Sequence, residues 1–560
     1  MVIKKDYKEL GREIRKHYWD TVNKTIELFP FDDAETKQVM LDLPRAFGED
    51  MADHGKPAEF PVQVYQEKLP KKVQEIIYME PTKLIAKMQK GELKVYDVIR
   101  YYFHAGLFAL MLTNCIYEFL PERALDQVKK LEKLQADGAD MSKYPLFGLP
   151  LGVKEMIPLK GYAPTHGSPC HLDRITNYDA QIVEISERLG AVTICRETNV
   201  QSLMALECEL WGHGLTVNPF NSKLAPGGSL GGSGATAGMR ALAVSLGSDI
   251  GGLIRSPAAC NGVYGLRLTL GRIPTLDYFS CQRGSQLIIS VTGPITRSLK
   301  MAELFMKLIV AAEPWLMDPS LAPIPWKLPE QKKFRVGFVE WDGNVMPHPP
   351  ILRGIREVKE KLSKLPNVEV VEFKQFGVDR SNEILGHLYF EDGGADTRAK
   401  CEATGEPILE QVHWAIDDAK ELTWPEQWDW NIKKDEFRKD YLKHWMLYTN
   451  DNGEKLDAVI GPVYPAVAPK HKTAKYWLYT SLYNTLDLPT LVVPVGTVDP
   501  AKDKPNTDYK PANDMDKFYR SIYELADDYK NAPIAVGVTG MRFTDEKLFD
   551  IARLFANEDE

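Results

Sequence analysis

The sequence predicts an α/β protein with a mixed, twisted sheet covered by helices on both faces, preceded by an N-terminal helical region. From about residue 145, short apolar runs of strand length alternate with amphipathic stretches of helical length. Before residue 140, apolar residues recur at spacings of three and four, which is typical of helices. Alternating strands and helices favour a covered sheet, because each helix must bury its apolar stripe.

The N-terminal region, residues 1–140, is predicted to be mainly helical and packed on the core. Its clearest element is the apolar stretch 95–103, which has helical spacing and lies between Gly91 and Pro121, two residues suited to helix boundaries. No low-complexity linker or internal repeat divides the rest of the chain. We therefore expect residues 141–560 to form one compact α/β unit.

The α/β unit is predicted from buried strands that share short apolar runs. These runs lie at 147–154, 191–195, 334–340, 368–373, 458–460, 491–493 and 534–538. Helices are predicted at 180–189 and 351–365, over much of 380–450, and from about residue 545. The tryptophans of the 380–450 region are expected to lie mostly in the core.

Composition limits the classes of function. The chain has 560 residues, 44% of them apolar, and a net charge of −9 with scattered basic residues, so no nucleic-acid partner is expected. Its seven cysteines include no C-x-x-C pair, which predicts reduced thiols without a metal site or a cofactor. No apolar run approaches the ~20 residues of a membrane helix, and the first residues do not look like a signal peptide. These features predict a soluble, cytoplasmic protein with no membrane partner.

Two glycine-rich stretches, 227–234 and 251–252, lie close together in the sequence. Nine glycines occur between Gly227 and Gly252. Glycine permits positive φ and close approach of the backbone, and N–H groups turned into a cavity can stabilise an oxyanion. The alternative is a tightly packed loop that contacts no ligand. Two clusters favour the functional interpretation.

Lys154 ends the apolar run 147–153. Burial would lower the pKa of this lysine and make it a base, whereas a side chain that reaches solvent would stay charged. From this fragment alone, the solvent-exposed alternative is favoured. Ser229 lies in a G-x-S-x-G pattern, but a nucleophile elbow needs a strand directly before it, and residues 218–226 look like a loop. The sequence therefore argues against an α/β-hydrolase.

Taken together, these motifs resemble the core of the amidase signature family. The resemblance rests on Lys154 at its strand end, on Asn218-Pro219, and on the segments 226–235 and 247–258. Segments 313–315, 341–354 and 456–462 are similar to the acetamidase-type branch. The resemblance covers nearly the whole chain and implies the α/β amidase signature fold.

The resemblance also implies roles for individual residues. The family cuts amides with a nucleophilic serine, a second serine held in a cis peptide, and a lysine. Lys154 and Ser229 match the lysine and the second serine, and are the candidate catalytic residues. The backbone of Ile250, Gly251 and Gly252 falls where the family forms its oxyanion hole. Nearby, Asp249 and Arg255 match residues expected to brace that loop through polar contacts.

Two residues depart from the family pattern. Leu253 stands at the position of the nucleophile, and Leu230 replaces the serine usually found beside the cis-peptide serine. Both changes replace a hydroxyl with a branched apolar group, so the centre should be drier and smaller. A leucine cannot attack a carbonyl, which predicts loss of ordinary serine-dependent hydrolysis.

Other nucleophiles near this position are disfavoured. Ser256 precedes a proline and is expected to point elsewhere, Ser248 matches a small polar position, and Cys260 fits a packing position. Ser229 is the least unfavourable substitute, although the resemblance gives it a proton-relay role.

Three functions stay open on the sequence. The favoured one is a redirected acid–base catalyst that acts through Lys154 and Ser229 on an amide- or carbonyl-containing small molecule. The second is a non-catalytic, small-molecule-binding pseudoamidase. The third is a residual amidase that uses Ser229 or an activated water. The expected partner is a small molecule, and a homodimer is left open.

Overall fold

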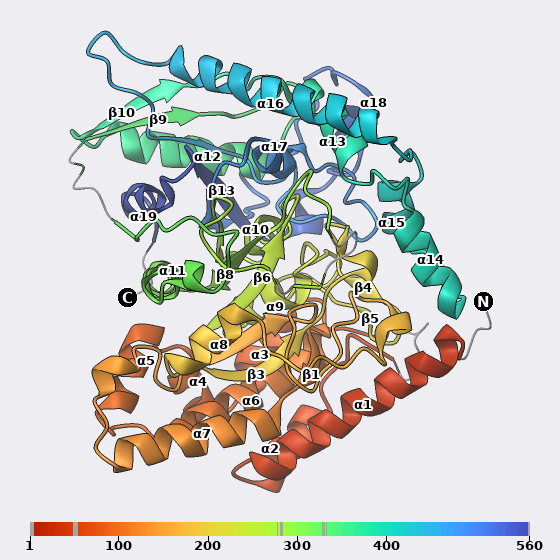
Figure 1. The fold of residues 1–560 in the computed structure, drawn as a ribbon, viewed down its shortest axis with the longest axis vertical. Helices are drawn as coiled ribbons and strands as arrows, with labels where there is room; N and C mark the ends of the chain where they lie inside the picture. Colours follow the sequence, from red (N-terminus) through yellow and green to blue (C-terminus); the bar gives the residue numbers. More distant parts are fainter. Residues whose placement is uncertain are drawn as a thin grey trace.

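The computed structural model describes residues 5–48, 54–276, 278–279, 284–327, 331 and 333–557. Within them, eleven strands form one mixed sheet in the order β1-β3-β2-β6-β8-β7-β12-β13-β11-β9-β10 (Figure 1). Neighbours in the trios β3-β2-β6 and β11-β9-β10 are parallel, and the remaining pairs are antiparallel. The predicted mixed sheet is thus confirmed.

The strands of this sheet are short and mostly buried. In chain order they are β1 (Ile116–Phe119), β2 (Pro150–Lys154), β3 (Val192–Glu197), β6 (Val244–Asp249), β7 (Tyr264–Arg267), β8 (Val291–Thr296), β9 (Phe334–Phe338), β10 (Val368–Glu372), β11 (Ala458–Gly461), β12 (Thr490–Thr497) and β13 (Pro533–Gly540). A separate two-stranded pair consists of β4 (Glu209–Leu210) and β5 (Gly214–Leu215).

The N-terminal helices gather at the lower end of the molecule in Figure 1, around the buried helix α6. They are α1 (Tyr7–Leu28), α2 (Ala34–Leu41), α3 (Pro61–Lys68), α4 (Lys71–Ile77), α5 (Pro81–Gln89), α6 (Val95–Thr113) and α7 (Pro121–Ala136). Gly91 precedes α6 as expected. Pro121 was expected to mark the end of the same helix, but α6 ends at Thr113 and Pro121 is the first residue of α7. This region also contributes β1 to the main sheet, where it pairs with β3. A division of the chain at residue 140 stays a prediction.

The other helices flank the sheet or form an outer layer. Those that flank it are α8 (Gln181–Arg188), α9 (Gly231–Gly238), α10 (Arg255–Cys260), α11 (Leu299–Ala311), α12 (Pro349–Ser363), α17 (Leu478–Leu486) and α19 (Asp545–Arg553). A further helix, α18 (Asp514–Ser521), lies at the upper right of Figure 1. The outer layer consists of α13 (Val378–Leu388), α14 (Ala395–Thr404), α15 (Glu410–Ile416) and α16 (Trp424–Met446), and α16 runs along the upper side of Figure 1. None of the helices in the described ranges combines the length and apolarity needed to cross a bilayer.

The small residues of α9 allow it to pack unusually closely. The helix reads GGSGATAG and contacts β2, β6, β8 and β1 as well as α6 and α10. A Cβ atom at Gly232 would lie 2.4 Å from the carbonyl oxygen of Cys115, and one at Gly234 would lie 2.4 Å from Asn261 Nδ2. These positions therefore require glycine because the backbone of α9 approaches its neighbours so closely.

Candidate active site

The side chain of Lys154 is completely buried at the end of β2. Its Nζ donates to Ser229 Oγ at 2.6 Å and contacts Ser248 Oγ at 3.3 Å. The solvent-exposed alternative for Lys154 is therefore wrong, because β2 lies inside the sheet between β3 and β6 and α9 packs against it. The structure brings the lysine together with two hydroxyls.

Ser229 follows a cis peptide bond with Gly228 and lies just before α9. A Cβ atom at Gly228 would lie 2.1 Å from the carbonyl oxygen of Glu207, so this turn needs a glycine. A helix does follow the G-x-S-x-G pattern, but residues 216–230 before it contain no strand. A nucleophile elbow needs a strand directly before the serine, so the structure agrees with the argument against one at Ser229.

Leu230 and Leu253 lie next to each other and are both buried. The main-chain N–H of Leu230 donates to the carbonyl of Leu253 at 3.4 Å. Leu230 packs so closely over Gly247 that a Cβ atom there would lie 1.7 Å from Leu230 Cδ2. Neither leucine can supply a hydroxyl to the group around Lys154.

Asp249 organises the loop that follows β6. Its Oδ1 accepts the main-chain N–H of Gly252 at 2.8 Å, its Oδ2 accepts that of Ile254 at 3.2 Å, and Arg255 forms a fully buried ion pair with it at 2.9 Å. Burial opposes ionisation, but the charge and hydrogen bonds of Arg255 and a hydrogen bond from Asn484 lower the pKa of Asp249. Because the Gly252 N–H is directed at Asp249, it is already engaged within the loop.

Two hydroxyls from distant segments fix the peptide planes of the same loop. Tyr389 Oη donates to the carbonyl of Ile250 at 3.0 Å, and Thr480 Oγ1 donates to that of Gly251 at 2.7 Å. In a trans peptide the N–H points opposite to the carbonyl, so the Tyr389 bond also sets the direction of the Gly251 N–H. Sequence analysis missed both residues, because nothing local marks a hydroxyl that acts so far along the chain.

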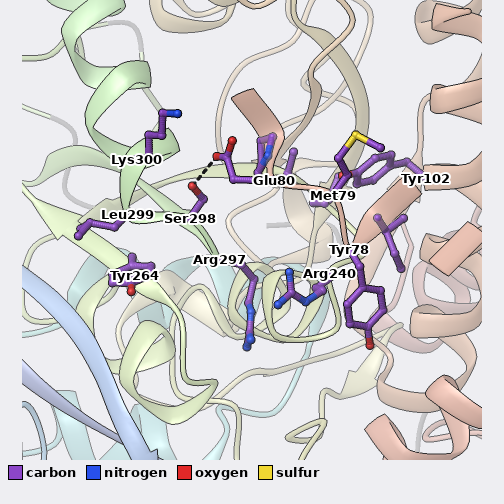
Figure 2. A pocket seen from close by; sticks show the side chains of 14 residues that line it. Tyr78, Met79, Glu80, Tyr102, Arg240, Tyr264, Arg297, Ser298, Leu299 and Lys300 are labelled. Atoms are coloured by element: carbon purple, nitrogen blue, oxygen red, sulfur yellow. Dashed lines mark hydrogen bonds between the residues drawn. The ribbon is translucent and has the colours of Figure 1, made fainter. Parts of the chain in front are cut away.

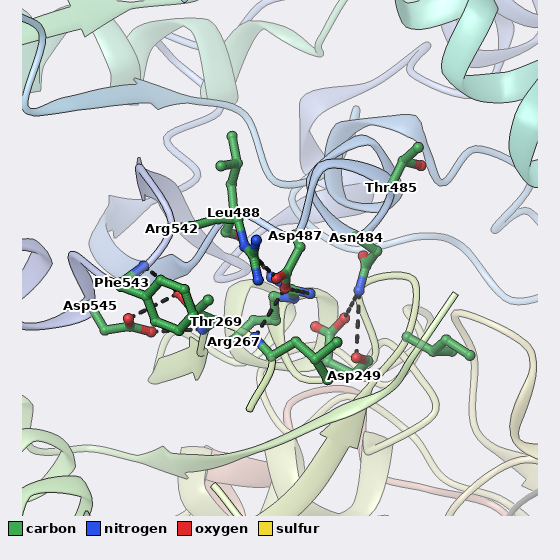
Figure 3. A network of polar contacts seen from close by, with 12 residues as sticks. Asp249, Arg267, Thr269, Asn484, Thr485, Asp487, Leu488, Arg542, Phe543 and Asp545 are labelled. Atoms are coloured by element: carbon green, nitrogen blue, oxygen red, sulfur yellow. Dashed lines mark hydrogen bonds and ion pairs between the residues drawn. The ribbon is translucent and has the colours of Figure 1, made fainter. Parts of the chain in front are cut away.

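A polar network continues from this loop into the C-terminal half of the chain (Figure 3). Asn484 Nδ2 donates to Asp249 Oδ1 at 3.0 Å. Just beyond α17, Asp487 accepts Arg267 Nη2 at 2.9 Å and Arg542 Nε at 2.8 Å. The network fixes α17 against the strands on which the loop is built.

An open cavity of about 550 Å³ lies against this group. Lys154 and Ser248 give it a polar wall, and Leu253 and Met204 are among its apolar residues. Lys154 is the one charged side chain among the described residues that line it. Ser248, which sequence analysis assigned only to a small polar position, therefore lines the cavity together with Lys154, whereas the buried Ser229 does not line it.

The comparison with known families decides the ancestry of this arrangement. The profile of the amidase family matches residues 97–549, well over half of the chain. The chain belongs to the amidase family. This amidase-family chain is 34% identical over 479 residues to an acetamidase of Emericella nidulans, covering 84% of the chain and 87% of that relative. It is also 34% identical over 491 residues to an acetamidase of Aspergillus oryzae, covering 84% and 88%.

The solved structures agree with this assignment. A fatty acid amide hydrolase superposes with a TM-score of 0.86 and 28% sequence identity, over 98% of this amidase-family chain and 95% of the other. The fold is therefore the α/β amidase signature fold, as the sequence resemblance implied.

Proposed function

We propose that this amidase-family protein is an acid–base catalyst that acts on an uncharged amide- or carbonyl-containing small molecule without forming an acyl-enzyme. The observation that carries the proposal is the contact of Lys154 with Ser229 and Ser248 beside an open cavity, with Leu253 at its edge. Leu253 occupies the position that the family resemblance assigns to the nucleophile.

The absence of a hydroxyl at position 253 argues against covalent catalysis there. An acyl-enzyme needs an oxygen or sulfur nucleophile, and the side chain of leucine carries no lone pair. A lysine amine in its neutral form can still accept a proton. Ser248 can pass a ligand proton to Lys154, since its hydroxyl lines the cavity and lies within reach of Nζ.

The lining of the cavity supports an uncharged ligand. Apart from Lys154, the described lining residues are apolar or neutral and polar, so a cationic ligand would lose its hydration without gaining an ion partner, and an anionic one would pair with the group that has to act as the base. Buried apolar surface contributes about 25 cal/mol per Å², which favours a ligand with an apolar body. We assign the orientation of the ligand carbonyl to the Ile250–Gly251 peptide, whose plane is held by the hydrogen bond from Tyr389.

The test compares Lys154→Met with the unchanged protein and with a control, Lys143→Met, whose lysine is exposed. Each protein is incubated with a small-molecule extract in D₂O and in H₂¹⁸O, and the products are followed by mass spectrometry. We expect deuterium incorporation or isomerisation of a compound that Lys154→Met abolishes and Lys143→Met retains. A compound that is bound but unchanged by all three proteins would indicate a binding protein.

The same incubations also distinguish acid–base catalysis without hydrolysis from the alternative that the protein is a residual amidase. Incorporation of ¹⁸O into a carboxylate product would indicate hydrolysis, either by activated water or through an acyl-enzyme that water then cleaves. A fluorophosphonate probe, which needs an activated serine, should leave the mass of the protein unchanged. An adduct mapped to Ser229 would overturn the proposal and assign the nucleophile to that serine.

A further inference from the structure

Two cavities lie apart from the one beside Lys154. The first, of about 420 Å³, lies between the N-terminal helices and the sheet, and the one carboxylate among its described lining residues is already engaged, because Glu80 Oε1 accepts the hydroxyl of Ser298 at 2.8 Å (Figure 2). The second, the outer cavity, has a volume of about 570 Å³ and is lined by residues of α13, α15 and α17. We propose that the outer cavity binds a small aryl compound that carries a hydrogen-bond acceptor. This site does not depend on the function proposed for the Lys154 cavity.

The outer cavity combines a charged rim with an aromatic floor. Its exposed charged residues have both signs, and they are Asp379, Glu383, Asp418 and Lys420. Deeper in the wall, Phe390, Tyr476 and Trp477 are buried. Trp414 is 39% exposed, and its ring centroid lies 5.8 Å from that of Trp477. The floor therefore favours a flat apolar ligand that can pack on aromatic rings, whereas the mixed rim selects no particular net charge.

Trp477 supplies a polar contact within this floor. The residue is only 8% exposed, and its Nε1 is buried without a hydrogen-bond partner among the described residues. An indole N–H can donate but cannot accept, so it needs an oxygen or nitrogen acceptor. A buried donor without an acceptor is unfavourable. A ligand acceptor in the outer cavity would satisfy this N–H group.

The Nε1 edge of Trp477 is turned away from the loop beside Lys154. A Cβ atom at Gly251 would lie 3.3 Å from Trp477 Cε3, so the Cε3 edge of the indole faces the loop. Cε3 and Nε1 lie on opposite edges of an indole. Trp477 lines the outer cavity and is not among the described residues that line the Lys154 cavity. The N–H group is therefore directed to the outer side of the ring.

Tyr389 forms the boundary between the two cavities. It is the one described residue that lines both of them. Its ring packs edge-on against Trp477, with centroids 5.8 Å apart and an angle of 67° excluded in favour of 63° between the ring planes. Its hydroxyl is held by the carbonyl of Ile250 at 3.0 Å. These contacts fix both rings, so the floor of the outer cavity is formed before a ligand binds, which lowers the entropic cost of binding.

The ligand class follows from the ring of Trp414 and the N–H group of Trp477. An aryl ring matches the partly exposed indole of Trp414, and a carbonyl oxygen or ring nitrogen on the same molecule matches the donor of Trp477. A volume near 570 Å³ is in the range of small-molecule sites, which span roughly 300–1,000 Å³. The cavity therefore suits one compact molecule with both features.

The test uses the full chain labelled with 5-fluorotryptophan, whose ¹⁹F signals report on each indole separately. Trp414→Phe and Trp477→Phe assign the two signals of interest. The probes are acetophenone, which has a carbonyl acceptor, and ethylbenzene, which has nearly the same shape without one. We expect acetophenone to shift the signals of Trp414 and Trp477 saturably, and ethylbenzene to bind about fivefold more weakly because it makes no hydrogen bond. The signal of Trp19 on α1 should not move.

The variants test the role of the donor. Trp477→Phe keeps a ring but loses the N–H group, so it should bind both probes equally, as followed by the Trp414 signal. Trp428→Phe is the control, since Trp428 is exposed on α16 and should retain the preference for acetophenone. If Trp477→Phe fails to fold, Trp414→Ala at the more exposed ring should weaken both probes and keep the preference, as followed by the Trp477 signal.

Two outcomes would overturn the proposal. The first is the absence of a saturable shift of the Trp414 signal, which would also be the result if acetophenone bound only in the Lys154 cavity. The second is a folded Trp477→Phe variant that still prefers acetophenone to ethylbenzene.

Discussion

The hydroxyl of Tyr389 donates to the main-chain carbonyl of Ile250 at 3.0 Å, and so joins the end of α13 to the loop beside Lys154. Tyr389 also lines the cavity beside Lys154. The outer helical layer therefore takes part in shaping a site whose lysine and Ser248 lie on strands β2 and β6. This contact leads to the first prediction.

Replacing Tyr389 with phenylalanine should loosen that loop. A net hydrogen bond contributes about 1 kcal/mol, so chemical denaturation should show a loss of that order. Hydrogen exchange at Gly251 and Gly252 should become faster. The matched control is Tyr529→Phe, which removes a similar hydroxyl-to-carbonyl bond to Ile522 at 3.0 Å and should leave the loop unaffected. Unchanged exchange in Tyr389→Phe would show that other contacts hold the loop.

Asp249→Asn should destabilise the protein strongly. Removing one partner of a buried ion pair costs about 3–5 kcal/mol, because Arg255 keeps its charge without a counterion. The pKa of Asp249 is lowered in the folded state, so its stabilisation is present at neutral pH and is lost as the pH falls through the acid range. Urea unfolding should show this loss, whereas Glu340→Gln at a partly exposed pair should cost about 1 kcal/mol or less.

Leu253→Ser should create a reactive serine beside Lys154. The change removes a buried side chain and should cost about 2–5 kcal/mol. It should also allow labelling by a fluorophosphonate and slow hydrolysis of a small amide. Leu253→Ala is the control, with a similar loss of stability but no adduct at residue 253. If Leu253→Ser stays unlabelled, Leu230→Ser is added; a folded double variant without an adduct would contradict the role assigned to position 253.

The stability of the protein should decrease between pH 5 and pH 8 through Glu406. Burial raises the pKa of this carboxyl to about 7, although hydrogen bonds from Ser168 and Cys401 oppose the shift. Because the pKa of Glu406 is higher in the folded protein than in the unfolded chain, protonation of Glu406 stabilises the fold. This stabilisation is fully present below the pKa of the unfolded chain and is lost as the pH rises through about 7. The loss is on the order of 3 kcal/mol at most.

Glu406→Gln should reduce this pH dependence, as measured by urea unfolding at several pH values. The exposed Glu402→Gln is the control and should leave it unchanged. A smaller decrease should remain in Glu406→Gln, since burial also raises the pKa of Glu207 to about 7. Equal curves for Glu406→Gln and the unchanged protein would contradict the assignment to Glu406.

Much of the sheet could be predicted because its strands are short apolar runs. Strands β2, β3, β9, β10, β11, β12 and β13 all lie at predicted runs. The sequence did not reveal β1, β6, β7 and β8. Strand β6 reads VSLGSD and β8 reads VTGPIT, so both lack an apolar run although every residue is buried. Their small residues suit the close packing of α9, which only the tertiary structure shows.

The site could be predicted only where residues lie close in the sequence or match a motif. Lys154, Ser229 and the loop 249–255 came from motifs, whereas Tyr389 and Thr480 come from segments that fold onto the loop from far away. The prediction that the tryptophans of residues 380–450 lie mostly in the core was only partly right. Trp445 is buried, but Trp424 is 72% exposed, because α16 packs on the molecule with only part of its surface.

The two borders of the large sheet also limit how copies of the chain can associate. Strand β1, at one border, is buried and contacts α1. Strand β10, at the other, carries the exposed residues Glu369 and Glu372, which form ion pairs with Arg335 and Lys359. Covered or charged edges disfavour the addition of a strand from another molecule. Intermolecular sheet extension, a common route to aggregation, is therefore disfavoured at both ends, and a homodimer of this chain would need to use other surfaces.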